Sequence, residues 1–168
     1  MTSADVLADA IGRVRHDVHR AVEGLSTEDL AFRVDREANS IGWLVWHLTR
    51  IQDDHVSDVA GNEQTWTADG WAERFDLPFD PSETGYAHSS EQVGAVQCNA
   101  GDLLGYFDAV HEQTLRFVRS LGDADLDRVV DTNWNPPVTL GVRLVSVIED
   151  DLQHAGQAAF VRGIVERS

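Results

Sequence analysis

Residues 140–165 carry the pattern that most constrains how this chain can fold. Residues that face a helical core recur there at alternating spacings of four and three, which is typical of a helix packed along its length against other helices. This seam consists of Leu140, Leu144, Val147, Asp151, His154, Ala158, Val161 and Val165. Asp150 lies one turn before His154 on the same side of the helix. A carboxylate and an imidazole are costly to bury there unless each finds a partner, and a divalent metal ion would satisfy both.

A third ligand to such an ion is offered by His47. Asn39 and Ser40 are suited to cap a helix, and seven of the eight residues in 41–48 are apolar or glycine, with His47 as the exception. Its ring shares a side of the helix with core residues one turn away in each direction. Two interpretations remain open: a core histidine that hydrogen-bonds to a backbone carbonyl or to Asp150, or a metal ligand oriented by Asp54.

Other titratable residues compete for functional roles. His111, with Asp108 three residues earlier, is the main rival for a metal site, although a structural role is favoured. His88 is a weak candidate, and Cys98 has no basic or histidine neighbour at helical spacing that would activate it. Surface positions are expected for the following residues: His16, His19, Asp53, Asp54, His55 and Asp58.

The helical periodicity predicts an all-α fold with four helices, over 4–23, from 41, from about 91 to 121, and from 140. We expect a single domain over residues 1–168. The segment 61–89 breaks the period and is long for a compact domain, so it is either a functional loop or a long crossover that lets helices two and three run parallel. Its aromatic residues are expected to cover one mouth of the bundle, or to form a packed loop with no ligand role: Trp66, Trp71, Phe75, Phe79 and Tyr86.

Composition narrows the class of partner. The formal net charge is −16, and none of the 13 basic residues is a lysine, which argues against nucleic acid or an anionic membrane as partner. No segment approaches the ~20 apolar residues of a membrane span, and the N-terminus has no signal-peptide pattern. A single cysteine fits a reducing compartment. We therefore expect a soluble cytoplasmic protein.

Two motifs carry a resemblance to a known family. Asn39-Ser-Ile-Gly-Trp-Leu-Val-Trp-His47-Leu-Thr-Arg, and later Asp150-x-x-x-His154-Ala-Gly-Gln-x-x-x-x-Arg162-Gly, resemble motifs of the DinB-like superfamily. The more similar branch includes the N-terminal domain of mycothiol-dependent maleylpyruvate isomerases and related thiol S-transferases. The resemblance implies an up-down-down-up four-helix bundle that binds one divalent ion, zinc or nickel, through His47, Asp150 and His154.

The chain departs from that family pattern in two ways. Many members have histidine, and the isomerases glutamate, at the position of Asp150, whose side chain is shorter. Either the last helix approaches more closely, or Asp151 takes the ligand role. The isomerases also have a second, C-terminal domain that supplies substrate contacts. A chain that ends at Ser168 is not expected to contain it, so isomerisation of maleylpyruvate is not expected.

The function implied by the resemblance is metal-dependent S-transfer from mycothiol or a similar low-molecular-weight thiol to a small electrophile. Arg50 and Arg143 lie on the ligand side of their helices and are candidates to hold the thiol, or else form surface ion pairs. The alternatives are a metal-binding bundle with hydrolytic or no catalytic activity, and a structural bundle whose buried polar residues only hydrogen-bond. The resemblance also raises the possibility of a homodimer.

Overall fold

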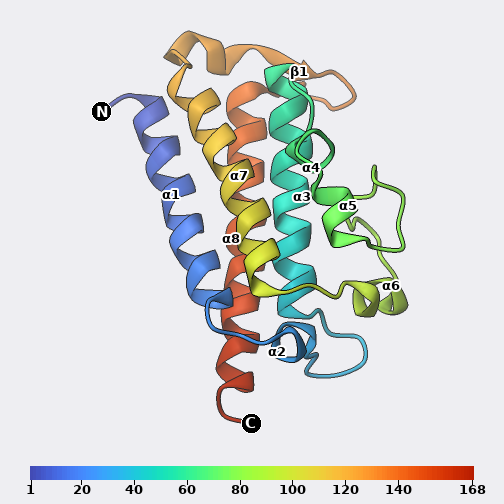
Figure 1. The fold of residues 1–168 in the computed structure, drawn as a ribbon. Coiled ribbons are helices and arrows are strands. Elements are labelled where there is room, and N and C mark those ends of the chain that lie inside the picture. The colour runs from blue at the N-terminus through green and yellow to red at the C-terminus, as the bar shows by residue number, and fades with distance from the viewer.

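The computed structural model describes residues 1–168, and four long helices form its framework (Figure 1). They are α1 (Ser3–Val22), α3 (Ile41–Ala60), α7 (Ala100–Arg119) and α8 (Leu140–Val165). α3 and α7 run in one direction, and α1 and α8 run in the other. α8 packs mainly against α3 and α1, and α7 packs against the same two helices. The predicted all-α, up-down-down-up bundle with a long connection between its second and third helices is confirmed.

Side-chain caps decide where the long helices begin. Oγ of Ser40 accepts a hydrogen bond from the Trp43 N–H at 3.1 Å, and Thr139 caps α8 in the same way through Val142 N–H. These bonds satisfy backbone donors that have no partner inside the first turn. α3 ends at Gly61, whose φ of 70° is the left-handed conformation that glycine adopts without strain. The predicted starts of the second and fourth long helices are therefore confirmed.

The predicted third helix, which was expected to run unbroken to Leu121, is wrong in its first part. A short helix, α6 (Ser90–Ala95), follows a capping box at Ser89, and the chain then turns extended at Val96. α7 starts only at Ala100, because the side chain of Asn99 accepts from Asp102 N–H at 2.9 Å. An asparagine in this role competes with helix continuation, so it divides one apparent periodic segment into two helices.

The connection from α3 to α7 contains two further short helices, α4 (Thr65–Ala68) and α5 (Trp71–Phe75). Together with α6 they lie along the flank of the bundle formed by α3 and α7, and they do not close one of its ends (Figure 1). Trp66 and Phe75 are buried there, whereas the Tyr86 side chain is exposed. The prediction that the aromatic residues cover a mouth of the bundle is therefore wrong, because most of them fill the side groove between the two parallel helices.

The remaining connections are short. α2 (Thr27–Ala31) follows α1, and the 3₁₀ helix η1 (Asp123–Asp127) follows α7. Two strands that the sequence did not predict, β1 (Val129–Asp131) and β2 (Val138–Thr139), then pair antiparallel, with Val129 opposite Thr139. None of the helices combines the length and apolarity that crossing a membrane requires.

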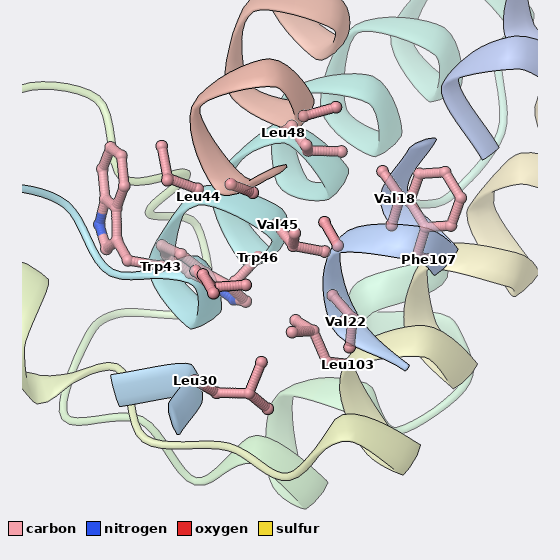
Figure 2. Close-up of a cluster of buried hydrophobic side chains, with 14 of the residues drawn as sticks. Val18, Val22, Leu30, Trp43, Leu44, Val45, Trp46, Leu48, Leu103 and Phe107 are labelled. Carbon is pink, nitrogen blue, oxygen red and sulfur yellow. The ribbon is translucent and has the colours of Figure 1, made fainter. Parts of the chain in front are cut away.

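The hydrophobic core lies between the four long helices, with the first turns of α3 at one end (Figure 2). α3 is buried on nearly all sides there, because the bundle covers one side and the connection to α7 covers the other. The side chains drawn in the close-up include Val18 and Val22 of α1, Trp46 and Leu48 of α3, and Phe107 of α7. This packing fixes the rotation of α3, and with it the direction in which His47 points.

Candidate metal centre

His47 of α3 and two residues of α8, Asp150 and His154, lie together at the interface of these helices. Each offers one ligand atom, and the three atoms lie within 4.8 Å of one another. Nε2 of His154 and Oδ1 of Asp150 are 3.6 Å apart, close to the ~3.4 Å that separates two ligands of a tetrahedral zinc ion. The side chains of Asp150 and His154 are 32% and 18% exposed, so the group is open to solvent on one side.

His47 is held in the orientation that a metal ligand needs. Its Nδ1–H donates to the carbonyl oxygen of Thr84 at 2.6 Å, which leaves the lone pair of Nε2 directed away from that carbonyl. Trp43, one turn earlier, stacks on the imidazole with ring centroids 4.6 Å apart. Burial lowers the pKa of His47, so the ring is neutral near pH 7 and its lone pair is available.

Gly85 allows the connection to approach His47 this closely. Its φ is 94°, and a Cβ at this position would lie 2.8 Å from Nδ1 of His47 and 3.0 Å from the ring of Trp46. Both the backbone conformation and the lack of space therefore require glycine. This contact could not be predicted from the sequence, because Thr84 and Gly85 belong to a segment without periodicity.

Asp150 has one carboxylate oxygen left without a partner. Oδ2 is buried and makes no hydrogen bond, while Oδ1 lies near His154. The contact with Asp150 raises the pKa of His154, despite the opposing effect of burial. A buried anionic oxygen without a donor is costly, and a cation between Asp150, His154 and His47 would satisfy it. The residues present therefore fit a divalent ion.

Asp151 is not part of this group. Its side chain is 2% exposed within the core, and burial raises the pKa of its carboxyl group well above the usual value. Between the two neighbouring aspartates, the structure thus places Asp150 beside the two imidazoles and Asp151 in the core.

The rival histidines have other surroundings. Asp108 accepts hydrogen bonds from Arg15 at 2.8 Å and from His19 at 2.9 Å, and no third ligand joins it with His111. His111 is buried in the core, where burial lowers its pKa to about 4. His16 is exposed as predicted, whereas His19 is half-buried through its contact with Asp108.

His88 and Cys98 also lie outside the ligand group. Nδ1 of His88 accepts from the indole N–H of Trp43, and Nε2 lies 3.1 Å from a Glu83 carboxylate oxygen, so the ring joins the connection to α3. Burial raises the pKa of Cys98 to about 12, so its thiol stays protonated and is a poor nucleophile.

Comparison with known proteins identifies the family. A family model described as mycothiol S-transferase matches residues 6–166. The chain belongs to the mycothiol S-transferase family. This family is of the DinB-like type that the sequence motifs resemble. No curated protein matches the chain.

The fold of this mycothiol S-transferase family member is also similar to that of a solved structure. A crystal structure of a conserved protein from Enterococcus faecalis superposes with a TM-score of 0.92 at 27% sequence identity. The match covers 100% of this chain and 99% of the other. The whole bundle, including the long connection that carries Thr84 and Gly85, therefore falls within the matched region.

Arg50 is not placed to hold a substrate in this family member. Its side chain is fully buried and donates to the carbonyl oxygens of Glu83 at 3.2 Å and Pro81 at 3.2 Å, and to the side chain of Gln64 at 2.8 Å. Neither a thiol-binding role nor a surface ion pair, the two alternatives predicted for Arg50, fits this burial, because the connection covers this side of α3. Through these hydrogen bonds, the guanidinium instead holds the segment that contacts His47 against α3.

The predicted position of Asp53 is also wrong. It was predicted to lie on a solvated face, but its side chain is 1% exposed. Its carboxylate accepts from the N–H groups of Thr65 and Trp66, which open α4, and from the Tyr106 hydroxyl at 2.9 Å. A carboxylate is favoured at the first N–H groups of a helix, so Asp53 fixes the start of the connection. Asp54 and His55 are half-buried, and Asp58 is exposed as predicted.

Arg143 lines a polar cavity of about 600 Å³ near the start of α8. Its guanidinium contacts Nδ1 of His55 at 2.7 Å and a carboxylate oxygen of Asp131 at 3.2 Å. Burial, and then the charge of Arg143, lower the pKa of His55. The other lining residues are Asp54, Ser57, Asp58, Asn62, Gln64, Val130 and Asn133. Arg143 precedes Asp150 by seven residues, or about 10 Å along α8, so the cavity lies within two turns of the ligand group.

Proposed function

We propose that this chain is a metal-dependent S-transferase that uses mycothiol or a related low-molecular-weight thiol. In this proposal His47, Asp150 and His154 bind one divalent ion, zinc or nickel, and the thiol attacks a small electrophile. The observation that carries it is the convergence of three ligand atoms within 4.8 Å in a chain of the mycothiol S-transferase family. The particular branch, typified by the N-terminal domain of mycothiol-dependent maleylpyruvate isomerases, belongs to the proposal as well.

The arrangement of the three side chains supports a catalytic ion over a structural one. Three protein ligands leave at least one position on zinc for an exogenous group, and the partial exposure of Asp150 and His154 provides access to it. When bound, the ion would lower the pKa of a thiol at that position enough to hold it as the thiolate near pH 7. Thr84 would hold His47 in the orientation of a metal ligand, because the hydrogen bond at Nδ1 fixes both the tautomer and the ring orientation.

The cavity beside Arg143 is the candidate subsite for the rest of the thiol. Carboxylates and amides dominate its lining, and Val130 is its one hydrophobic residue. Such a lining suits a ligand that donates hydroxyl hydrogens, as the sugar-like part of mycothiol does, better than an anionic ligand. The charge of Arg143 is already balanced by Asp131, so we propose that Arg143 binds the thiol as a hydrogen-bond donor and not as a free cation.

Metal analysis of the purified protein tests the first half of the proposal. We expect about one divalent ion per chain in the wild type and loss of that ion in Asp150→Ala. Glu149→Ala, which removes an exposed carboxylate from the adjacent position on α8, is the matched control and should retain the metal. Full metal content in Asp150→Ala would show that Asp150 is not a ligand.

Thiol turnover tests the second half. Metal-loaded protein is incubated with mycothiol and a panel of small electrophiles, and loss of free thiol is followed over time. We expect thiol consumption that stops in Asp150→Ala and persists in Glu149→Ala. A protein that holds its metal but consumes no thiol with any electrophile would contradict the transferase and favour the alternative, a metal-binding bundle with hydrolytic or no catalytic activity.

A further inference from the structure

Trp43 packs against both imidazoles of the candidate metal centre. Its indole, which is 6% exposed, stacks on His47 with ring centroids 4.6 Å apart and an angle of 14° between the planes. The same indole meets the ring of His154 edge to face, at 6.2 Å and 87°. The two imidazoles lie 4.9 Å apart and are inclined at 74° to each other. A rotation of the indole would therefore change how the two proposed ligand rings face each other.

A hydrogen bond fixes the orientation of this indole. Nε1–H of Trp43 donates to Nδ1 of His88 at 3.2 Å. By contrast, the indole N–H groups of Trp46, Trp66 and Trp71 are buried without an acceptor. Burial in this part of the molecule thus does not by itself provide an acceptor, and the bond to His88 is a specific contact. Turning the indole over about its second side-chain torsion would break the bond, so the bond selects one of the two orientations.

His88 is itself held in the state that can accept this bond. An indole is only a donor, so Nδ1 of His88 carries the lone pair and Nε2 carries the hydrogen. That hydrogen is donated to Oε2 of Glu83 at 3.1 Å. The His88 side chain is 2% exposed, and its ring packs against Trp46 at 5.8 Å and Phe79 at 4.7 Å. Both the tautomer and the position of His88 are therefore determined by its surroundings.

We propose that Trp43 and His88 are positioning residues of the candidate metal centre. His88 fixes the indole of Trp43, and the indole fixes the relative orientation of the His47 and His154 rings. Neither residue belongs to the ligand group. The inference rests on the proposed function, because it takes the two imidazoles as ligands. The connection then acts on His47 twice, through the Thr84 carbonyl at the ring edge and through the held indole at the ring face.

Titration with Co²⁺ tests this role, since the visible absorption of the bound ion reports both occupancy and coordination geometry. His88→Phe keeps an aromatic ring in place but removes the acceptor for Trp43. We expect this variant to raise the dissociation constant for Co²⁺ by about tenfold or more and to alter the absorption spectrum. In His88→Gln the side-chain amide can accept from Trp43 and donate to Glu83, so this variant should recover both properties.

A double-mutant cycle shows whether His88 acts through Trp43. Trp43→Phe keeps a ring that stacks on His47 but has no N–H to donate. His88→Phe should therefore weaken Co²⁺ binding in the wild-type background and have no further effect in the Trp43→Phe background. Equal fold-changes in the two backgrounds would overturn the positioning role. Trp71→Phe, which removes an indole N–H without a partner, is the matched control and should bind Co²⁺ like the wild type.

The indole N–H signals of the metal-free protein, followed by NMR, test the contact without any ion. In His88→Phe we expect the Trp43 signal to move upfield and to exchange faster with solvent, while the Trp71 signal stays unchanged. An unchanged Trp43 signal would contradict the inference. A wild type that binds no Co²⁺ would overturn the proposed function and this inference with it. If the wild type binds Co²⁺ and His88→Phe binds it equally well, only the positioning role is wrong.

Discussion

At the scale of single residues, the candidate centre depends on contacts that lie far apart in the sequence. His47 could be selected from the sequence because it is the one polar side chain among apolar neighbours in 41–48. Asp150 and His154 could be selected from their spacing in an apolar seam. The Thr84 carbonyl that orients His47 could not be selected, since any residue supplies a carbonyl and only the fold decides which one arrives. Arg50 and Asp53 were misplaced for a related reason: periodicity shows which side of a helix is polar but not what covers it.

Gly85 offers a test of how closely the connection must approach His47. Gly85→Ala introduces a Cβ that would lie 2.8 Å from Nδ1 of His47 and forces a residue with a side chain to adopt a φ of 94°. We expect a loss of about 1–3 kcal/mol in unfolding free energy. The affinity for a divalent ion should fall about tenfold or more, because the hydrogen bond that orients the ligand is disturbed. Chemical denaturation and a metal-competition titration measure these effects.

Gly61→Ala is the control for this prediction. Gly61 also has a positive φ, of 70°, but a Cβ there would meet no atom within 4 Å. The variant should lose stability through backbone strain alone and keep its metal affinity. If both variants lose metal affinity equally, the contact between Gly85 and His47 is not responsible.

His111 should make the protein sensitive to acid. Burial lowers its pKa from 6.5 to about 4, and Nδ1 has no hydrogen-bond partner. In the unfolded chain, His111 therefore binds a proton as the pH falls below 6.5. In the folded chain, it binds a proton only when the pH falls to about 4. Neutral His111 makes its full contribution to the unfolding free energy above pH 6.5. As the pH falls to about 4, the unfolding free energy decreases by about 3 kcal/mol.

Urea denaturation of wild type and His111→Leu at a series of pH values measures this contribution. We expect the variant to lose about 3 kcal/mol less than the wild type between neutral pH and about pH 4. His16→Leu, at an exposed position, should keep the pH dependence of the wild type. An unchanged slope in His111→Leu would show that His111 titrates normally in the folded protein.

At the scale of elements, caps and periodicity predicted most of the framework. Ser40 and Thr139 begin α3 and α8 at the expected residues, and the seam of α8 is buried except at His154 and Val165, which are partly exposed. The division of the third helix at Asn99 was missed because apolar residues continue with helical spacing on both sides of it. The course of the connection over the flank of α3 and α7 was also missed, because it depends on long-range contacts that no local pattern carries.

Arg50 should control the attachment of that connection. Arg50→Met removes a fully buried guanidinium that binds the carbonyls of Pro81 and Glu83 and lies 3.8 Å from the Asp53 carboxylate. We expect a loss of about 3–5 kcal/mol, because the Asp53 charge and the two carbonyls lose their partner. Arg50→Lys should recover little of the loss, since an ammonium cannot span the same acceptors. Denaturation midpoints and limited proteolysis of residues 76–90 measure the effect.

Arg36→Met is the matched control for this experiment. Arg36 is exposed and lies at the surface beside Glu37, so its loss should change the stability by less than about 0.5 kcal/mol. Equal protease resistance in Arg50→Met and Arg36→Met would show that the connection is held by its aromatic residues instead.

At the scale of the whole molecule, the bundle brings together two segments about a hundred residues apart. The sequence predicted the fold class, and the resemblance supplied the helix directions, because the order up-down-down-up does not follow from periodicity alone. The exposed apolar residues of α8, such as Val145 and Phe160, were not interpreted from the sequence, because exposed apolar residues on a helix become informative only once the inner face is known.

Removal of the metal should destabilise the whole bundle if the proposed centre is correct. A ligand that binds only the folded state stabilises it by about 2.7 kcal/mol at a free concentration of 100 times its dissociation constant. For a domain of this size we expect a chelator to lower the melting temperature by about 5–10 °C. Differential scanning calorimetry with and without chelator measures the shift. Asp150→Ala should melt at the same temperature under both conditions, and a wild type that does so too would argue against metal binding.

The parallel course of α3 and α7 has an evolutionary consequence. A chain that must travel back along the bundle between them carries a segment of 39 residues, from Gly61 to Asn99, whose sequence is largely free of helical periodicity. This segment touches His47 but supplies none of the three ligand side chains. Swapping it between related bundles would change the groups that surround His47 and preserve the three proposed ligand side chains, so we expect such an exchange to alter substrate preference through recombination at two helix ends.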